Sequence, residues 1–361
     1  MKEYKFPYEW ALKDTVFTKD KGKVFSCFSC GGGSTMGYKL AGFDVIGCNE
    51  IDPKMMSAYI ANHNPRFPYL ESIQTFKDRD DLPPELYELD ILDGSPPCSS
   101  FSMAGNREKD WGKEKKFREG QADQVLDTLF FDFIALAKKL QPKVVIAENV
   151  KGLLLGDAQK YVSEIYDALQ DAGYYVAHKL LDASKMGVPQ RRERVFFYAI
   201  RKDLYQGDFM DLFQTEPRLD LNFNEAPITF RVATEKYWDQ GGKCIEKYAV
   251  GKEYGNLREG EQSEKYFQLI RLDRNKVCPT LVGSCDSPSS ASLTHPSMCR
   301  KLNKEELCNL GSYPQDFNFQ ENLPGYIIGM SVPPVMTAQV ASCVLDQWLT
   351  IKTKPKNTKK L

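Results

Sequence analysis

The chain has 361 residues, a length that fits two or three domains or one large domain with an insertion. Hydrophobic residues make up 42% and charged residues 27%, which excludes a collagen or a disordered polymer and supplies a large core. The 48 basic and 49 acidic residues leave a formal charge of −1, so any nucleic acid must be bound by local basic patches. A charged N-terminus, ten cysteines and no run of about 18 apolar residues predict a cytoplasmic protein with reduced thiols and no membrane span.

Short apolar runs alternate with amphipathic stretches through the first 200 residues. The runs are rich in Val, Ile, Phe and Cys and are typical of buried strands; they occupy residues 23–27, 44–48, 89–92, 144–147 and 195–200. Helices are predicted at 128–140 and at 161–172, where Gly173 ends the pattern. This alternation predicts an α/β fold over residues 1–200: a Rossmann-like, mostly parallel sheet with helices on both faces.

The pattern changes after residue 200. Residues 201–278 contain scattered turn residues and short aromatic segments, and we expect a smaller, separate domain there. Helical periodicity returns at 303–310 and 335–349, so residues 279–361 are expected to return to the first domain. Their last part, 352–361, is rich in lysine and is expected to form a basic, solvated tail.

A glycine-rich turn, Phe28 to Gly33, follows the first predicted strand and precedes a helix. The second strand ends in Asn49-Glu50-Ile51-Asp52, and an acidic residue in this place can accept hydrogen bonds from ribose hydroxyls. Together the two features predict a nucleotide-like cofactor. Met36 stands where a dinucleotide fingerprint needs glycine, which disfavours a nicotinamide enzyme. Cys27 and Cys30 form a Cys-x-x-Cys without a second pair, so no metal site is predicted.

Reactive side chains are expected where other strands of the sheet end. Two prolines hold Cys98 on a rigid loop, from which a thiol could attack a bound substrate. Glu148 follows the next strand, and a carboxyl group there could act as an acid or a hydrogen-bond donor. Gln190, Arg192 and Arg194 alternate along an extended segment and therefore form one polar row.

In this order and at these spacings, the motifs resemble those of the cytosine-5 DNA methyltransferases. The likeness covers about residues 23–200 and 279–348. The matching blocks are Phe28 to Gly33 with Gly37, Asn49-Glu50-Ile51-Asp52, Gly94-Ser95-Pro96-Pro97-Cys98, Thr128-Leu129-Phe130, Glu148-Asn149-Val150, Gln190-Arg191-Arg192-Glu193-Arg194, Arg300-Lys301-Leu302 and Gly329-Met330-Ser331-Val332-Pro333.

The resemblance implies a nucleotide-binding α/β domain that the C-terminal helix completes, with a target-recognition domain inserted at 201–278. It implies S-adenosylmethionine as the cofactor, S-adenosylhomocysteine as the product, and no metal. The catalytic residues that it implies are Cys98, Glu148, Asn149, Gln190, Arg192 and Arg194. The implied cofactor site consists of Phe28, Ser29, Cys30, Gly31, Gly33, Glu50, Ile51, Ser72, Ile73, Ser95, Pro97, Leu129, Met330 and Val332. The family usually has Gly, Asp and Asn where this chain has Cys30, Ser72 and Met330.

The reaction implied by the resemblance is methylation of cytosine at C5 in a specific sequence of double-stranded DNA. Cys98 would add to C6 of a flipped-out cytosine, while Glu148 would bind N3. A monomer acting on DNA is expected, in a bacterial or phage-encoded, nucleoid-associated setting; a cognate restriction endonuclease is a further candidate partner. The basic segment 105–121 follows Cys98 and is predicted to form a mobile lid.

Two alternatives remain open on the same scaffold. An RNA cytosine methyltransferase of the transfer-RNA type would be expected to carry a Cys-Phe-Thr element, which we do not find. A catalytically silent DNA-binding relative would be expected to lack Cys98 or Glu148, and both are present.

Overall fold

The structure is a computed structural model that describes residues 4–97, 114–115, 124–125, 128–156, 158–206 and 216–350. Three features of the sequence analysis fall largely or wholly outside these ranges: Cys98, most of the predicted lid at 105–121, and the predicted tail at 352–361.

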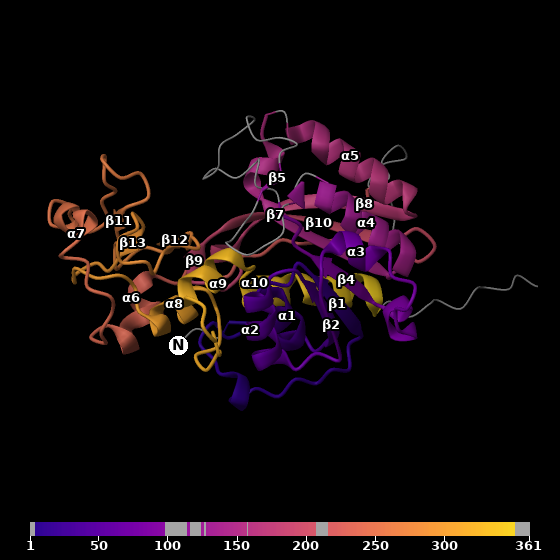
Figure 1. Cartoon of the computed structure of the whole chain (residues 1–361), viewed down its shortest axis with the longest axis horizontal. Coiled ribbons are helices and arrows are strands. Elements are labelled where there is room, and N and C mark those ends of the chain that lie inside the picture. The colour runs from indigo at the N-terminus through magenta and orange to yellow at the C-terminus, as the bar shows by residue number, and fades with distance from the viewer. Residues whose placement is uncertain are drawn as a thin grey trace, which may run out of the picture.

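A seven-stranded sheet forms the centre of the larger lobe (Figure 1). Its strand order is β3-β2-β1-β4-β7-β10-β8; β10 runs antiparallel to both of its neighbours, and the other neighbours pair in parallel. The strands are β1 (Lys23–Cys27), β2 (Asp44–Glu50), β3 (Phe67–Leu70), β4 (Ile91–Gly94), β7 (Val144–Val150), β8 (Tyr174–Asp182) and β10 (Glu193–Arg201). A short pair, β5 (Glu114–Lys115) and β6 (Gln124–Val125), stands apart. The predicted α/β fold with a mostly parallel sheet is confirmed.

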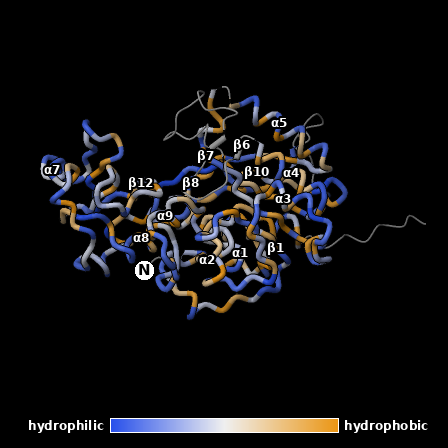
Figure 2. Tube along the Cα trace, in the orientation of Figure 1, coloured by the Kyte–Doolittle hydropathy of each residue, from blue (hydrophilic) through white to orange (hydrophobic). Residues whose placement is uncertain are grey.

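Helices cover both faces of this sheet (Figure 1). They are α1 (Gly33–Leu40), α2 (Pro53–His63), α3 (Ile73–Lys77), α4 (Leu129–Leu140), α5 (Ala158–Asp171) and α10 (Pro334–Val344). Successive strand residues point to opposite faces: Phe25 and Phe197 pack with α3, α4 and α5, whereas Val24 and Phe196 pack with α1 and α10. Figure 2 shows hydrophobic residues concentrated where these layers meet. Burial on both faces explains why these strands appear as continuous apolar runs.

The packing of α10 against α1 depends on glycine. A Cβ atom at Gly37 would lie 2.4 Å from the carbonyl oxygen of Pro334, closer than real side chains approach. The absent side chain lets the two helices touch backbone to backbone. The last helix of the sheet domain is therefore fixed to the first one.

A smaller lobe adjoins the carboxyl-end side of the sheet (Figure 1). It contains α6 (Phe230–Thr234), α7 (Ala249–Tyr254), β11 (Ile270–Arg271), β12 (Cys278–Pro279), β13 (Leu293–Thr294) and α8 (Lys304–Leu310). Its own core includes Ile245, Val250, Tyr254, Leu257 and Leu269. The strand β9 (Gln190–Arg191) of the larger lobe pairs with β12, and α9 (Pro324–Met330) leads back to α10. Short 3-10 helices are η1 (Leu12–Asp14), η2 (Pro84–Glu88), η5 (Lys151–Leu154), η6 (Ala183–Lys185) and η7 (Glu235–Tyr237).

Contacts cross both ends of the predicted domain at 201–278. Leu219 and Leu221 pack in the core of the larger lobe, beside Trp348. At the other end, β11 pairs with β13, which lies beyond residue 278. The division of the chain into domains remains a prediction.

Residues Pro324–Leu349 are long and apolar enough to cross a membrane, with a mean hydropathy of 1.5. Two features mark them as part of the protein core. Serine and proline interrupt the helix between α9 and α10, and 89% of the most apolar stretch is buried inside the structure. The π-helical turn Leu345–Leu349 ends the run.

Candidate active site

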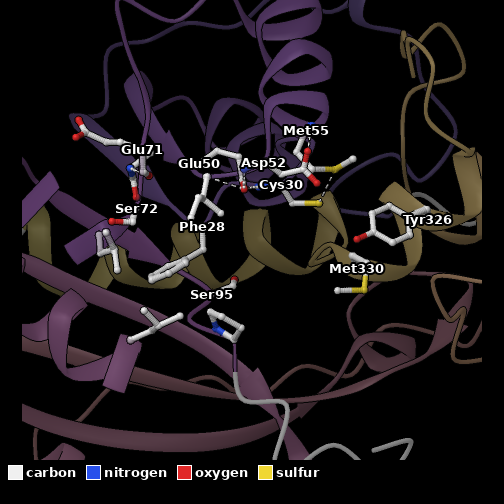
Figure 3. A pocket seen from close by; sticks show the side chains of 15 residues that line it. Phe28, Cys30, Glu50, Asp52, Met55, Glu71, Ser72, Ser95, Tyr326 and Met330 are labelled. Carbon is white, nitrogen blue, oxygen red and sulfur yellow. Dashed lines mark hydrogen bonds between the residues drawn. The ribbon is translucent and has the colours of Figure 1, made fainter. Parts of the chain in front are cut away.

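A pocket opens where β1, β2 and β4 end. From β1 the chain runs to β2 on one side of the sheet, whereas the next strand on the other side is β4, so the strand order reverses at β1. Open α/β sheets bind ligands at such a point of reversal. The pocket is elongated: Glu71 and Ser72 lie at one end, and Tyr326 and Met330 lie at the other (Figure 3). Its lining consists of Phe28, Cys30, Asn49, Glu50, Ile51, Asp52, Met55, Glu71, Ser72, Ile73, Ser95, Pro97, Leu129, Tyr326 and Met330.

Most residues that the sequence suggested for the cofactor line this pocket, but Ser29, Gly31, Gly33 and Val332 do not. The two glycines face the C-terminal segment instead. A Cβ atom at Gly31 would lie 2.5 Å from the side chain of Ile327, and one at Gly33 would lie 2.4 Å from the carbonyl oxygen of Val332. These glycines allow close packing behind the pocket.

Five lining residues are not among the cofactor residues that the sequence suggested: Asn49, Asp52, Met55, Glu71 and Tyr326. Asn49 donates a hydrogen bond to the carbonyl oxygen of Glu71 at 2.8 Å, which joins the ends of β2 and β3. Asp52 caps α2 by accepting from the backbone N–H of Lys54 at 2.8 Å. Asp52 could have been found, because Asp before Pro at a helix start is a capping signal.

Ser72 caps α3 by accepting from the backbone N–H of Thr75 at 3.1 Å. The family usually has a carboxylate at this position. Here the carboxylate at this end of the pocket belongs to the preceding residue, Glu71, which pairs with Arg79 at 3.1 Å.

The turn after β1 is bound tightly to Glu50. Phe28 and Cys30 have φ angles of 52° and 48°, in the left-handed region that glycine adopts most easily. The backbone N–H of Cys30 donates to one Glu50 oxygen at 2.7 Å, and the N–H groups of Ile51 and Asp52 donate to the other at 2.9 Å each. A carboxylate offers about four acceptor positions, so about one remains for a ligand hydroxyl. Burial raises the pKa of Glu50 in spite of these hydrogen bonds.

The charge of the pocket selects among nucleotide ligands. Three carboxyl residues line it, Glu50, Asp52 and Glu71, and no Lys or Arg is found among the described lining residues. A pyrophosphate would meet these carboxylates without a lining cation to offset the repulsion. A nucleoside with a positive charge and an apolar ring fits, because Phe28, Ile73 and Leu129 supply apolar surface beside the carboxylates. Within the described ranges, no three His, Cys, Asp or Glu side chains are grouped as metal ligands.

A buried carboxyl group, missed in the sequence, joins β4 to β1 and α1 behind the pocket. Asp93 is 4% exposed and accepts hydrogen bonds from Ser26 at 2.8 Å, Ser34 at 2.7 Å and Tyr38 at 3.1 Å. Burial outweighs these hydrogen bonds and raises the pKa of Asp93 to about 6.

Asp93→Asn should change how stability depends on pH. The pKa of Asp93 is raised in the folded state, so between pH 4 and 6 the folded protein holds a proton that the unfolded chain has released. The contribution of Asp93 to stability is therefore highest below this window and falls as pH rises. The free energy of unfolding of the wild type, relative to Asp93→Asn, should drop by about 1 kcal/mol from pH 5 to pH 7. Urea unfolding of both proteins measures this; a constant difference would contradict the raised pKa.

The loop that leads to Cys98 begins beside Glu148. Asn149 donates a hydrogen bond to the carbonyl oxygen of Pro96 at 3.1 Å, and β4 pairs in parallel with β7. Pro97 lines the cofactor pocket, and Cys98, which follows it, lies outside the described residues. The structure thus brings the approach to Cys98, the pocket and Glu148 to neighbouring strand ends.

Glu148 is held by Arg194. The Arg194 Nε lies 2.9 Å from Glu148 Oε1, and the two side chains are 15% and 12% exposed. Burial lowers the pKa of Arg194, although the nearby Glu148 carboxylate opposes this effect. The pair leaves part of the Glu148 carboxyl group available to a substrate.

Gln190 and Arg192 are buried and bind backbone. Arg192 is 2% exposed and donates to the carbonyl oxygens of Leu281 at 3.1 Å and Gly329 at 3.0 Å. Burial lowers the pKa of Arg192 to about 9. Gln190 donates to the carbonyl oxygen of Leu310 at 3.2 Å and accepts from the Leu281 N–H at 3.0 Å. Both side chains connect the larger lobe to segments that border the smaller one.

A second hollow, which we call the interlobe cleft, lies between the two lobes. The larger lobe contributes Val150, Lys151, Gly152, Arg191, Glu193 and Arg194, and the other wall consists of Gln262, Phe267, Gln268, Ile270, Pro279, Thr280, Val282, Ser292 and Leu293. Arg194 connects this cleft to Glu148. Its basic residues form the kind of local patch that the near-neutral chain would need to bind DNA.

The sheet is mostly parallel with one inserted antiparallel strand, and the acidic pocket lies where its strand order reverses. Together these features define an α/β domain with a cofactor site. The family model of the C-5 cytosine-specific DNA methylases matches residues 22–345. The chain belongs to this family of S-adenosylmethionine-dependent DNA methyltransferases, which confirms the resemblance seen in the motifs.

Individual proteins show the same relationship. The Type II methyltransferase M.FnuDI of Fusobacterium nucleatum is 37% identical over 357 residues, which are 92% of this chain and 97% of that protein. A putative DNA modification methyltransferase encoded within a prophage of E. coli is 22% identical, with a TM-score of 0.67 over 91% of this chain and 99% of its own. A mutant form of Spodoptera frugiperda DNMT2 is 17% identical, with a TM-score of 0.62 over 90% and 99%. At these identities the two structures support the fold alone.

Proposed function

We propose that the protein transfers a methyl group from S-adenosylmethionine to C5 of a cytosine in a specific sequence of double-stranded DNA. The observation that carries this proposal is the meeting of three features at neighbouring strand ends. These features are an acidic pocket with no basic residue among its described lining, the segment that leads to Cys98, and the Glu148–Arg194 pair.

The pocket fits this cofactor in shape and charge. The remaining acceptor position of Glu50 suits a ribose hydroxyl, and Phe28, Ile73 and Leu129 suit an adenine ring. Asp52, at the start of α2, suits the ammonium group at the amino-acid end of the molecule. S-adenosylmethionine supplies a methyl group on a sulfonium, which an electron-rich carbon can attack.

Cytosine C5 is too weak a nucleophile to attack that methyl group unaided. We infer that the Cys98 thiolate bonds to C6 and pushes an electron pair toward C5. Glu148 delivers a proton to N3, which neutralises the charge that this addition places in the ring, and it takes the proton back when the thiolate is expelled. After C5 has taken the methyl group, its proton leaves to solvent, the C5–C6 double bond re-forms, and the thiolate is expelled.

The other site residues position these groups. Arg194 orients Glu148, and Asn149 holds the carbonyl group of Pro96. Gln190 and Arg192 fix the backbone at the border of the smaller lobe, so we assign them a positioning role. Because these groups cannot reach a stacked base, the cytosine must leave the duplex, at a cost of about a few kcal/mol.

We infer that DNA enters the interlobe cleft and that recognition of its sequence resides in the smaller lobe. Lys151 and Arg191 on the opposite wall suit phosphates, which position a duplex without reading its sequence. We further propose that the protein acts as a monomer in the bacterial cytoplasm and protects DNA from a partner endonuclease. The class of the relative M.FnuDI, a Type II methyltransferase, supports the DNA-modifying part of this proposal.

DNA containing 5-fluorocytosine at the target position tests the covalent step. Addition and methyl transfer can proceed on this base, but release needs a cation to leave C5, and fluorine cannot leave as one. The protein should therefore remain bonded to C6, and a denaturing gel should show a band at the summed mass of protein and DNA. The band should require S-adenosylmethionine. A base-resolution methylation map from a methylation-free host must first provide the target, and methylation of that target without any trapping would disprove addition by Cys98.

A further inference from the structure

Two buried polar side chains that the mechanism does not use meet behind the glycine-rich turn. Lys39, near the end of α1, and His63, the last residue of α2, are each 8% exposed. The Lys39 Nζ lies 3.3 Å from His63 Nδ1 and 3.3 Å from the His63 carbonyl oxygen. Among the described residues, Lys39 forms hydrogen bonds only with His63. A buried ammonium group is usually paired with a carboxylate, so this contact calls for an explanation.

The contact with Lys39 decides which nitrogen of the His63 ring carries the hydrogen. Burial, together with the nearby charge of Lys39, lowers the pKa of His63 well below its usual value, so the ring is neutral. Burial also lowers the pKa of Lys39 to about 8, and this ammonium group therefore keeps its proton at neutral pH. Because an ammonium group can only donate, Nδ1 accepts and the ring hydrogen lies on Nε2.

The Nε2 atom of His63 points at the backbone of the turn. A Cβ atom at Gly32 would lie 2.2 Å from Nε2, so glycine leaves the room that the imidazole occupies. Nε2 is buried and has no well-aligned hydrogen bond to a described residue, yet the backbone of Gly31 favours a proton on the ring. A Gly31 carbonyl group that is near but poorly aligned accounts for both observations. It is the acceptor that the Nε2–H group can reach.

The same turn carries side chains of the cofactor pocket. Phe28 and Cys30 line the pocket (Figure 3), and both have positive φ angles, which are unfavourable for residues other than glycine. Glu50 holds this turn by accepting from the Cys30 N–H at 2.7 Å, whereas His63 reaches the turn at Gly32. A turn in an unfavourable conformation depends on such contacts to keep its shape.

We propose that His63 positions the glycine-rich turn for the cofactor, and that Lys39 keeps its ring in the tautomer that donates to Gly31. The inference rests on the proposed function and adds two positioning residues to the cofactor site. The hydrogen bond becomes well aligned when the cofactor settles against the turn. Loss of the donor weakens cofactor binding and leaves the chemistry of Cys98 and Glu148, which belong to other strand ends, unchanged.

Calorimetric titration with S-adenosylhomocysteine tests this role without catalysis. His63→Phe keeps an aromatic ring but has no donor, and it should bind about 10-fold more weakly, as expected for one buried hydrogen bond. His63→Gln can place an amide N–H where Nε2 lies and should stay within about threefold of the wild type. At saturating S-adenosylmethionine and DNA, kcat of both variants should remain within about twofold, so that the loss appears in KM.

Asn62→Ala is a matched control on the same helix. Asn62 precedes His63 and joins α2 to Asn318 through two hydrogen bonds of 2.8 Å each, but it does not line the pocket. Its loss should lower the melting temperature and leave the affinity for S-adenosylhomocysteine unchanged. The control thus separates a loosened α2 from a missing donor.

Nitrogen NMR of protein labelled in its three histidines reads the tautomer directly. The His63 signals, identified by their loss in His63→Gln, should show a hydrogen on Nε2, and this proton should move downfield when S-adenosylhomocysteine is added. Lys39→Met removes the donor to Nδ1 and should admit the second tautomer.

The outcomes separate this inference from the proposed function. A hydrogen on Nδ1 in the wild type, full affinity in His63→Phe, or equal losses in His63→Phe and His63→Gln would overturn the positioning role of His63. An unchanged tautomer in Lys39→Met would overturn the role of Lys39. A wild type that binds no S-adenosylhomocysteine would overturn the proposed function instead.

Discussion

Cys98→Ser should lose methyl transfer by a factor of about 10³ or more and keep its affinity for DNA and for S-adenosylmethionine. A hydroxyl group is nearly the same size as a thiol, so binding surfaces change little. Its conjugate base is scarce at neutral pH, whereas a thiolate is accessible, and addition to C6 needs the anion. Transfer of a tritiated methyl group to DNA measures the rate, and a gel shift measures DNA affinity.

Cys244→Ser provides a matched control for this change. Cys244 is exposed, belongs to the smaller lobe and does not line the cofactor pocket, so its loss should leave the rate within about twofold. If Cys98→Ser kept substantial activity, a different nucleophile would have to form the bond to C6. The 5-fluorocytosine adduct should disappear in Cys98→Ser and persist in Cys244→Ser.

Glu148→Gln should lower kcat by about 10²- to 10⁴-fold, with a smaller effect on KM. The amide keeps the shape of the side chain and can still accept a hydrogen bond from Arg194. The amide cannot deliver a proton to N3, so the charge that addition at C6 creates in the ring is not neutralised. Single-turnover rates on a defined duplex, measured from pH 6 to 9, separate this loss from slow product release.

Glu88→Gln is the matched control for Glu148. Glu88 pairs with Lys23 at 2.7 Å, is 67% exposed, and lines neither the cofactor pocket nor the interlobe cleft. Such a surface pair contributes little, so Glu88→Gln should turn over nearly as the wild type does. Near-normal turnover by Glu148→Gln would show that another group, or water, supplies the proton to N3.

The strands that the sequence revealed are those buried on both faces. β1, β2, β4, β7 and β10 each contain a continuous apolar run, because helices cover them above and below. The two edge strands were missed. β3 includes Pro68, which a strand tolerates at an edge where only one neighbour needs its hydrogen bonds, and β8 carries His178 and Lys179 at its half-exposed positions.

Within the site, the sequence predicted residues that a motif places at strand ends, and it missed those that depend on distant partners. Glu50 follows from its place at the end of a strand, and Leu129 follows from the family resemblance of its motif. Asp93 accepts hydrogen bonds from Ser34 and Tyr38, which lie more than 50 residues earlier in the chain. The sequence around Asp93 contains no sign of these two partners. The backbone contacts of Arg192 likewise lie 89 and 137 residues away, so its burial could not be seen in a charged Gln-Arg-Arg-Glu-Arg run.

The pocket draws one wall from Phe28 and Cys30 and another from Tyr326 and Met330, so it joins the beginning of the chain to its last tenth. The N-terminal segment is bound to the same late region: Trp10 donates to the carbonyl oxygen of Ser312 at 3.0 Å, and Asp316 accepts from the Leu12 N–H at 2.7 Å. During synthesis, the apolar surface of the early strands therefore stays exposed until α9 and α10 have been made. Contacts so distant in sequence slow folding, and a chain interrupted before residue 324 would have neither a complete pocket nor a covered sheet. Premature termination should thus give an aggregating fragment and never a partly active enzyme.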